Sequence, residues 1–157
     1  MRHLLIAVAF VALTTFASAQ TCPYTVTFTP YGVSCSTISS TPPTLTYPGF
    51  PSGPVCNETI QTNVPPLPGF TLTDRALFYG ATEINQPLAN GCPLLTTIDG
   101  VITLPALEGI ITLEFLLTPD PALIGLTVNL QAINRRRDDA TGSLAVETSN
   151  ALRVQFQ

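Results

Sequence analysis

The chain has 157 residues, with six Lys or Arg side chains against ten Asp or Glu, and its formal net charge is −4. This acidic balance argues against a nucleic acid or an anionic membrane as the partner, because either would require a basic face.

The first 19 residues have the pattern of a secretory signal peptide. A positively charged start precedes a nearly unbroken apolar run at 4–16, and small residues follow at 17–19. We expect cleavage between Ala19 and Gln20. The alternative, a membrane anchor, is disfavoured because the apolar run is shorter than the roughly 20 residues that a spanning helix needs. The mature chain, residues 20–157, has the length of a single domain, and we expect it to be secreted, extracellular or on the cell surface, without a membrane span.

All four cysteines, Cys22, Cys35, Cys56 and Cys92, lie in the predicted mature chain. An even number of cysteines in an exported protein predicts two disulfides. A zinc site is disfavoured because the chain has no Cys-x-x-Cys spacing and its only histidine is His3. Four cysteines allow three pairings, and their spacing does not choose among them.

Apolar and polar residues alternate with a period of two along much of the mature chain, which is typical of half-buried strands. The stretches at 24–29, 111–117, 126–132 and 151–156 show this pattern most clearly. The side chains predicted to point inward are Tyr24, Val26, Phe28, Ile111, Leu113, Phe115, Leu117, Leu126, Val128, Leu130, Ala132, Leu152, Val154 and Phe156.

Turn signals separate the predicted strands. Asp99 and Gly100 predict a hairpin between 94–98 and 101–104, because a type I′ turn favours this dipeptide. We interpret 140–142 and 149–150 as further turns. The arginine run at 135–137 is followed by two aspartates, and we interpret it as a solvated turn as well.

A proline-rich stretch at 41–69 interrupts the alternating pattern. Proline removes backbone donors from a sheet, so this stretch predicts long loops with one or two short edge strands. The whole pattern predicts an all-β fold, an antiparallel β-sandwich of about eight strands that is immunoglobulin-like or jelly-roll-like. The mature chain then forms one domain with a proline-rich loop region.

Catalytic groups are scarce in the mature chain. It has neither His nor Lys, which excludes a Ser-His-Asp or Cys-His nucleophile and a lysine Schiff base. Paired carboxylates are the one enzymatic route left. The candidates are Asp74, Glu83, Glu108, Glu114 and Asp120. We interpret each as a surface charge, although Glu114 lies in an otherwise apolar strand.

Binding groups are scarce as well. The loop at 138–142 offers oxygen ligands for calcium but lacks the regular spacing of a calcium motif, and arginines adjoin it. Asn57 begins an Asn-Glu-Thr glycosylation sequon. We therefore predict no catalytic, cofactor-binding or metal-binding residue. A cluster of Tyr31, Tyr47, Phe50 and Tyr79 on the surface would favour carbohydrate binding.

Several short segments of the chain resemble an uncharacterised family of small exported bacterial β-sandwich domains. These are Gly32-Val33-Ser34-Cys35, Gly91-Cys92-Pro93-Leu94-Leu95, a strand with Gln131-Ala132, and the closing Ser149-Asn150-Ala151-Leu152. The resemblance implies a bridge between Cys35 and Cys92, which leaves Cys22 and Cys56 for the second. The family carries no activity that transfers to this chain.

Together these features predict a non-enzymatic protein with a structural, adhesive or assembly role. The alternative is an extracellular ligand-binding module, with carbohydrate as its expected ligand. Self-association or an extracellular glycan or protein are the partners that these roles imply.

Overall fold

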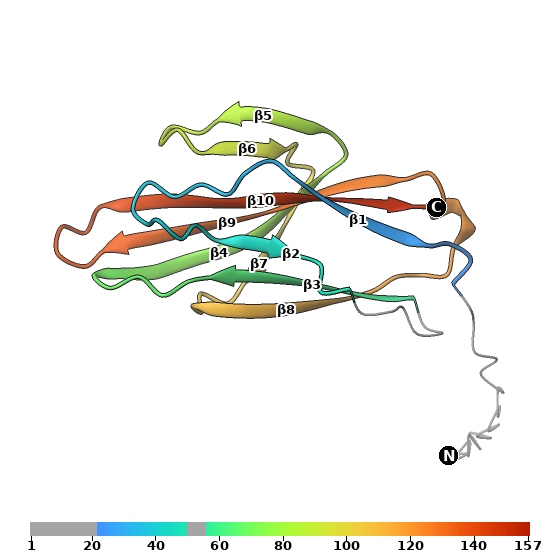
Figure 1. The fold of residues 1–157 in the computed structure, drawn as a ribbon, viewed down its shortest axis with the longest axis horizontal. Coiled ribbons are helices and arrows are strands. Elements are labelled where there is room, and N and C mark those ends of the chain that lie inside the picture. The colour runs from blue at the N-terminus through green and yellow to red at the C-terminus, as the bar shows by residue number, and fades with distance from the viewer. Residues whose placement is uncertain (1–21, 50–55) are drawn as a thin grey trace, which may run out of the picture.

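The computed structural model describes residues 22–49 and 56–157 (Figure 1). The predicted signal peptide and its cleavage site lie outside the described residues, as does Phe50. The described part of the chain is all-β, with ten strands and one short 3-10 turn. The elements are β1 (Val26–Tyr31), β2 (Thr44–Thr46), β3 (Asn57–Val64), β4 (Phe70–Gly80), β5 (Glu83–Pro87), β6 (Pro93–Thr96), β7 (Gly100–Leu104), β8 (Gly109–Leu116), η1 (Pro121–Leu123), β9 (Thr127–Asp138) and β10 (Leu144–Phe156).

The strands form three antiparallel sheets. The largest has the order β1-β10-β9-β4-β7, the second has the order β2-β3-β8, and β5 pairs only with β6. Figure 1 shows the small β5–β6 sheet on one side of the five-stranded sheet and β2-β3-β8 on the other. The predicted number of about eight strands is therefore too low within the described residues, and the prediction missed the third sheet.

One apolar core joins the two larger sheets. Leu45 of β2 and Ile60 of β3 are fully buried, and so are Leu77 of β4 and Ala132 of β9 on the opposite sheet. This arrangement follows from the alternating sequence, because every second side chain of a strand points to the same face. The predicted inward face of the last strand is confirmed, with Leu152, Val154 and Phe156 all buried.

Two disulfides connect the three sheets. Cys22–Cys56 joins the segment that leads into β1 to the residue directly before β3, with the two Cα atoms 5.3 Å apart, and so connects the two larger sheets. The second disulfide joins Cys35 to Cys92, with a Cα separation of 5.4 Å. Cys35 forms a β-bridge with Thr148 of β10, and Cys92 directly precedes β6. The structure thus has the pairing that the family resemblance implies. Two disulfides indicate an oxidising environment.

The predicted hairpin at Asp99 and Gly100 is wrong. The segment before it, β6, pairs with β5, and the strand after it, β7, pairs with β4. The dipeptide instead carries the chain from the small sheet into the large one, with the Asp99 N–H bonded to Tyr79 O at 2.9 Å. Turn chemistry shows that the chain bends there but does not show which strands pair.

The arginine run is also not a turn, because 135–137 lies inside β9. Arg135 and Arg137 are exposed, whereas Arg136 points inward and is only 1% exposed. The predicted turn at 149–150 is likewise a bulge within β10, where its pairing with β9 shifts register between Thr148 and Ala151. The turn at 140–142 does join β9 to β10.

The described part of the proline-rich stretch contains more strand than predicted. β2 is a short edge strand, as expected, but β3 is an eight-residue strand at the centre of its sheet. Its proline-free sequence 57–64 pairs with β8 in regular register over its whole length. In the described residues no helix has the length and apolar character needed to cross a membrane.

Candidate functional site

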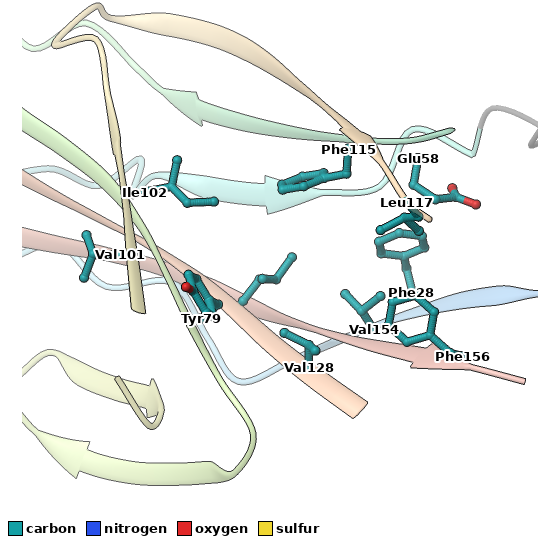
Figure 2. A pocket seen from close by; sticks show the side chains of 11 residues that line it. Phe28, Glu58, Tyr79, Val101, Ile102, Phe115, Leu117, Val128, Val154 and Phe156 are labelled. Atoms are coloured by element: carbon teal, nitrogen blue, oxygen red, sulfur yellow. The ribbon is translucent and has the colours of Figure 1, made fainter. Parts of the chain in front are cut away.

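An apolar cleft of about 350 Å³ lies between the two larger sheets (Figure 2). On the side of the three-stranded sheet, the cleft is lined by Glu58 of β3, by Phe115 of β8 and by Leu117, which directly follows β8. The other lining residues belong to the five-stranded sheet, and they are Phe28, Tyr79, Val101, Ile102, Val128, Leu130, Val154 and Phe156. Only Glu58 and Tyr79 have polar side chains among these described lining residues.

The two ends of the cleft differ in character. Tyr79, Val101 and Ile102 lie at one end, and their exposed fractions of 39%, 49% and 37% show that solvent reaches it. Figure 2 shows Glu58 at the other end, beside Leu117 and Phe28. The open end lies along β7, which is an edge strand. An apolar molecule could therefore enter past β7 and extend toward Glu58.

The shape of the open end depends on a close contact between Gly100 and Tyr79. A Cβ atom on Gly100 would lie 2.1 Å from the phenol ring of Tyr79. No side chain larger than hydrogen fits at this position while Tyr79 keeps its place. Gly100 thus allows the Tyr79 ring to lie close to the start of β7, where it forms part of the cleft wall.

Glu58 lies inside because of its position in β3. Glu58, Ile60, Thr62 and Val64 are buried on the inward face, and the residues between them face outward. Its carboxylate accepts a hydrogen bond from the Tyr47 hydroxyl, with 3.2 Å between Tyr47 Oη and Glu58 Oε2. The Tyr47 ring stacks on Phe28, with 4.0 Å between the ring centroids. Phe28 and Tyr47 thus form the wall behind the carboxylate.

Burial dominates the electrostatics of this end of the cleft. It raises the pKa of Glu58 above the usual value for glutamate, and the Tyr47 hydrogen bond opposes this effect. Burial and then the nearby Glu58 carboxylate also raise the pKa of Tyr47 and of Tyr24, so both phenols are neutral at physiological pH. The site therefore combines one ionisable acid with neutral hydroxyl groups and apolar walls.

Comparisons with known proteins identify no relative of this chain. No family model matches it, and neither the curated proteins nor the solved structures include one that is detectably similar. The resemblance to exported bacterial domains therefore stays a prediction.

None of the five predicted carboxylates lines the cleft. Asp74 and Glu83 are exposed and form ion pairs with Arg135 and Arg153. Glu108 pairs with Arg136, Glu114 lies on the exposed face of β8, and Asp120 accepts a hydrogen bond from the Ala122 N–H at 2.9 Å. The structure thus distributes these side chains over the surface and does not assemble them as a pair in the cleft.

Sequence reasoning missed Glu58 as a site residue. It stood out only as part of the Asn57 sequon, and Asn57 itself is exposed at the start of β3. The signal that could have identified Glu58 is its even spacing from Ile60 and Val64, which places it on the same face as two core residues. The preceding prolines hid this alternation.

The other candidate sites serve structural roles. Asp138 Oδ1 accepts hydrogen bonds from the N–H groups of Ala140 and Thr141, which closes the loop on itself and lowers the pKa of Asp138. No group of three or more metal-ligating His, Cys, Asp or Glu side chains occurs among the described residues.

The tyrosines do not form the surface cluster that carbohydrate binding would favour. Tyr31 donates a hydrogen bond to Leu95 O at 3.0 Å, Tyr47 is half-buried against Phe28, and Tyr79 lines the open end of the cleft. They therefore occupy three separate environments.

Proposed function

We propose that this chain is an exported, non-enzymatic protein that binds an apolar ligand in the cleft between its two larger sheets. One observation carries this proposal: a cleft of about 350 Å³ has walls made almost entirely of aliphatic and aromatic side chains and is open to solvent at one end. Clefts of about 300–1,000 Å³ with apolar walls and few polar groups are typical of small-molecule sites. We infer further that the two facing sheets form a β-sandwich, to which the β5–β6 sheet is an addition.

Export is supported by the two disulfides and by the signal pattern of the first 19 residues. A binding role in place of catalysis is supported by the positions of the carboxylates. Glu58 is the only acid among the described residues of the cleft lining, so the site offers no second carboxylate to act with it in hydrolysis.

Titration with a series of linear alcohols tests the proposal. Each added methylene should tighten binding by about fourfold until the cleft is full, because burial of one methylene contributes about 0.8 kcal/mol. Isothermal titration calorimetry on the mature, oxidised protein measures this dependence. Absence of binding by every alcohol in the series would contradict the proposal.

A pair of matched variants locates the ligand. Ile102→Asn places an amide at the mouth of the cleft and should weaken alcohol binding several-fold. Ile110→Asn makes the same change on the outer face of β8, where Ile110 is 64% exposed, and should leave binding unchanged. Equal effects of the two substitutions would place the alcohol outside the cleft.

A second candidate function, assembly by self-association, is favoured by the edge of β8. This strand has eight residues paired without a bulge to β3, and it contains neither lysine nor proline, the residues that commonly protect a sheet edge. An antiparallel second copy centred on Leu113 would pair Ile110 with Leu116 and Thr112 with Glu114. The exposed apolar residues of this edge thus complement one another.

Sedimentation velocity over a range of protein concentrations tests assembly. The wild-type protein should associate, and Leu116→Lys should abolish association by placing a charge on the edge. Val33→Lys is the control, since Val33 is exposed in a loop outside the strands. A wild-type protein that stays monomeric at all concentrations would exclude this function.

A further inference from the structure

Among the described residues, the carboxylate at the inner end of the cleft has no cationic partner. The four ion pairs of the described residues do not include Glu58. The two arginines that are buried in the described part of the chain bind elsewhere, Arg136 to Glu147 and Arg75 to the backbone carbonyl oxygens of Leu107 and Gly109. Glu58, only 5% exposed, thus has a neutral hydroxyl as its hydrogen-bond donor. A buried acid with this environment is costly to ionise unless a cation reaches it.

We propose that the ligand of the cleft is an amphiphile with an alkyl chain and a primary ammonium head, and that the head pairs with Glu58. This inference rests on the proposed function, since it names the ligand class of the same cleft. The alkyl chain would lie against Phe115, Val128 and Leu130, and the ammonium group would donate hydrogen bonds to the Glu58 carboxylate.

Charge complementarity distinguishes this ligand from other amphiphiles. A fatty acid would bring a second carboxylate to Glu58, and like charges at short range are unfavourable. An alcohol fits the apolar walls equally well but offers only a neutral donor, as Tyr47 already does. An ammonium group supplies the interaction that Glu58 lacks among the described residues, an ion pair with a cation.

This pairing makes binding depend on pH. The ammonium head requires an ionised Glu58, and burial raises the pKa of this acid, so affinity should increase as the pH rises from acidic values toward neutrality. The other titratable groups near Glu58 are Tyr47 and Tyr24, with Asp120 beyond Tyr24 at the surface. Both phenols have raised pKa values and stay protonated over this range.

Calorimetric titration with octylammonium, 1-octanol and octanoate tests the inference on the mature, oxidised protein. At neutral pH octylammonium should bind about tenfold more tightly than 1-octanol, because its positive charge adds coulombic attraction to the hydrogen bond with the ionised carboxylate, and a neutral alcohol does not. Octanoate should bind more weakly than 1-octanol. The advantage of octylammonium over 1-octanol should shrink at acidic pH and vanish in Glu58→Gln.

Glu114→Gln is the matched control, because it removes one negative charge from the outer face of β8 and should leave the preference intact. A cooperative urea transition followed by far-ultraviolet circular dichroism shows that Glu58→Gln is folded. Equal affinity of the wild-type protein for octanol and octylammonium would contradict the inference that the ligand has an ammonium head. The proposal that the cleft binds an apolar ligand would remain supported. A preference that persists in Glu58→Gln, or that Glu114→Gln reduces equally, would also overturn it. Failure of all three probes to bind would contradict the proposed function itself.

Discussion

Replacing Arg136 with Met should lower the free energy of unfolding by about 3–5 kcal/mol, the usual effect of breaking a buried ion pair. Arg136 Nε lies 2.7 Å from Glu147 Oε2, and both side chains are almost fully buried. The substitution leaves the Glu147 carboxylate with the Ser36 hydroxyl, 2.6 Å away, as its remaining side-chain donor. It also removes donors from Pro65 O and from Glu108, whose side chain is 35% exposed and contributes less.

Urea denaturation with both disulfides intact measures this loss. The chain has no tryptophan, so far-ultraviolet circular dichroism is the suitable signal. Arg135→Met is the control, because Arg135 adjoins Arg136 and pairs with Asp74 at 2.6 Å while both side chains are about half exposed. An exposed pair of this kind contributes about 0–1 kcal/mol.

A double-mutant cycle with Glu147→Gln completes the test. Arg136→Met and Glu147→Gln together should cost less than the sum of the two single changes, since neither then leaves an unpaired buried charge. The reasoning is refuted if Arg136→Met costs no more than Arg135→Met. Simple additivity of the two changes would show that the guanidinium and the carboxylate do not stabilise each other.

Three further predictions concern other parts of the fold. Burial raises the pKa of Glu58, so the folded protein holds the Glu58 proton more tightly than the unfolded chain does. The stability that this proton contributes is present below the usual glutamate pKa and is lost as the pH rises through the raised pKa. Glu58→Gln should therefore be more favourable to stability at pH 7 than at pH 4. Gly80→Ala should cost about 1–3 kcal/mol, since its Cβ would lie 2.1 Å from the Thr97 carbonyl oxygen. Replacing Cys35 and Cys92 with serine should cost on the order of 4 kcal/mol, because the bridge closes a long loop.

Urea denaturation checks each of these predictions. For Glu58, the quantity is the difference in stability between variant and wild type, and a difference independent of pH would contradict the argument. Gly109→Ala is not a suitable control for Gly80, because its positive φ of 88° adds strain. Thr103→Ala, on the exposed edge strand β7, serves instead and should have little effect. A serine pair as stable as wild type would show that the Cys35–Cys92 bridge is dispensable.

Local pattern was sufficient to predict the type of structure and part of the core. The period-two alternation at 151–156 placed Leu152, Val154 and Phe156 inside, because side chains alternate across any strand whatever its neighbours are. The predicted disulfides depended on the number of cysteines and on the export signal, and the Cys35–Cys92 pairing on the family resemblance.

Pairing between strands was beyond the reach of local pattern. Asp99 and Gly100 are residues typical of a hairpin turn, but the strands on either side of them do not pair with each other. β6 pairs with β5, and β7 pairs with β4. A turn dipeptide determines only how the backbone bends. The choice of partners depends on the packing of whole sheets, which also produced the third sheet that the prediction missed.

The sequence by itself determined an all-β chain with two disulfides, in which apolar and polar side chains alternate along the strands. Strand periodicity and the number of cysteines can be read from the sequence without knowing which segments meet in space. Tertiary structure alone decided where the charges lie. Arg136 was predicted to be solvated and is buried, since Glu147 and Pro65 meet it from distant segments. The sequence marks Glu58 only as the middle residue of a glycosylation sequon, whereas the structure places it in the cleft, because it lies on the inward face of β3. The burial of a charge depends on what the opposite sheet brings to it, and that information is spread over the whole chain.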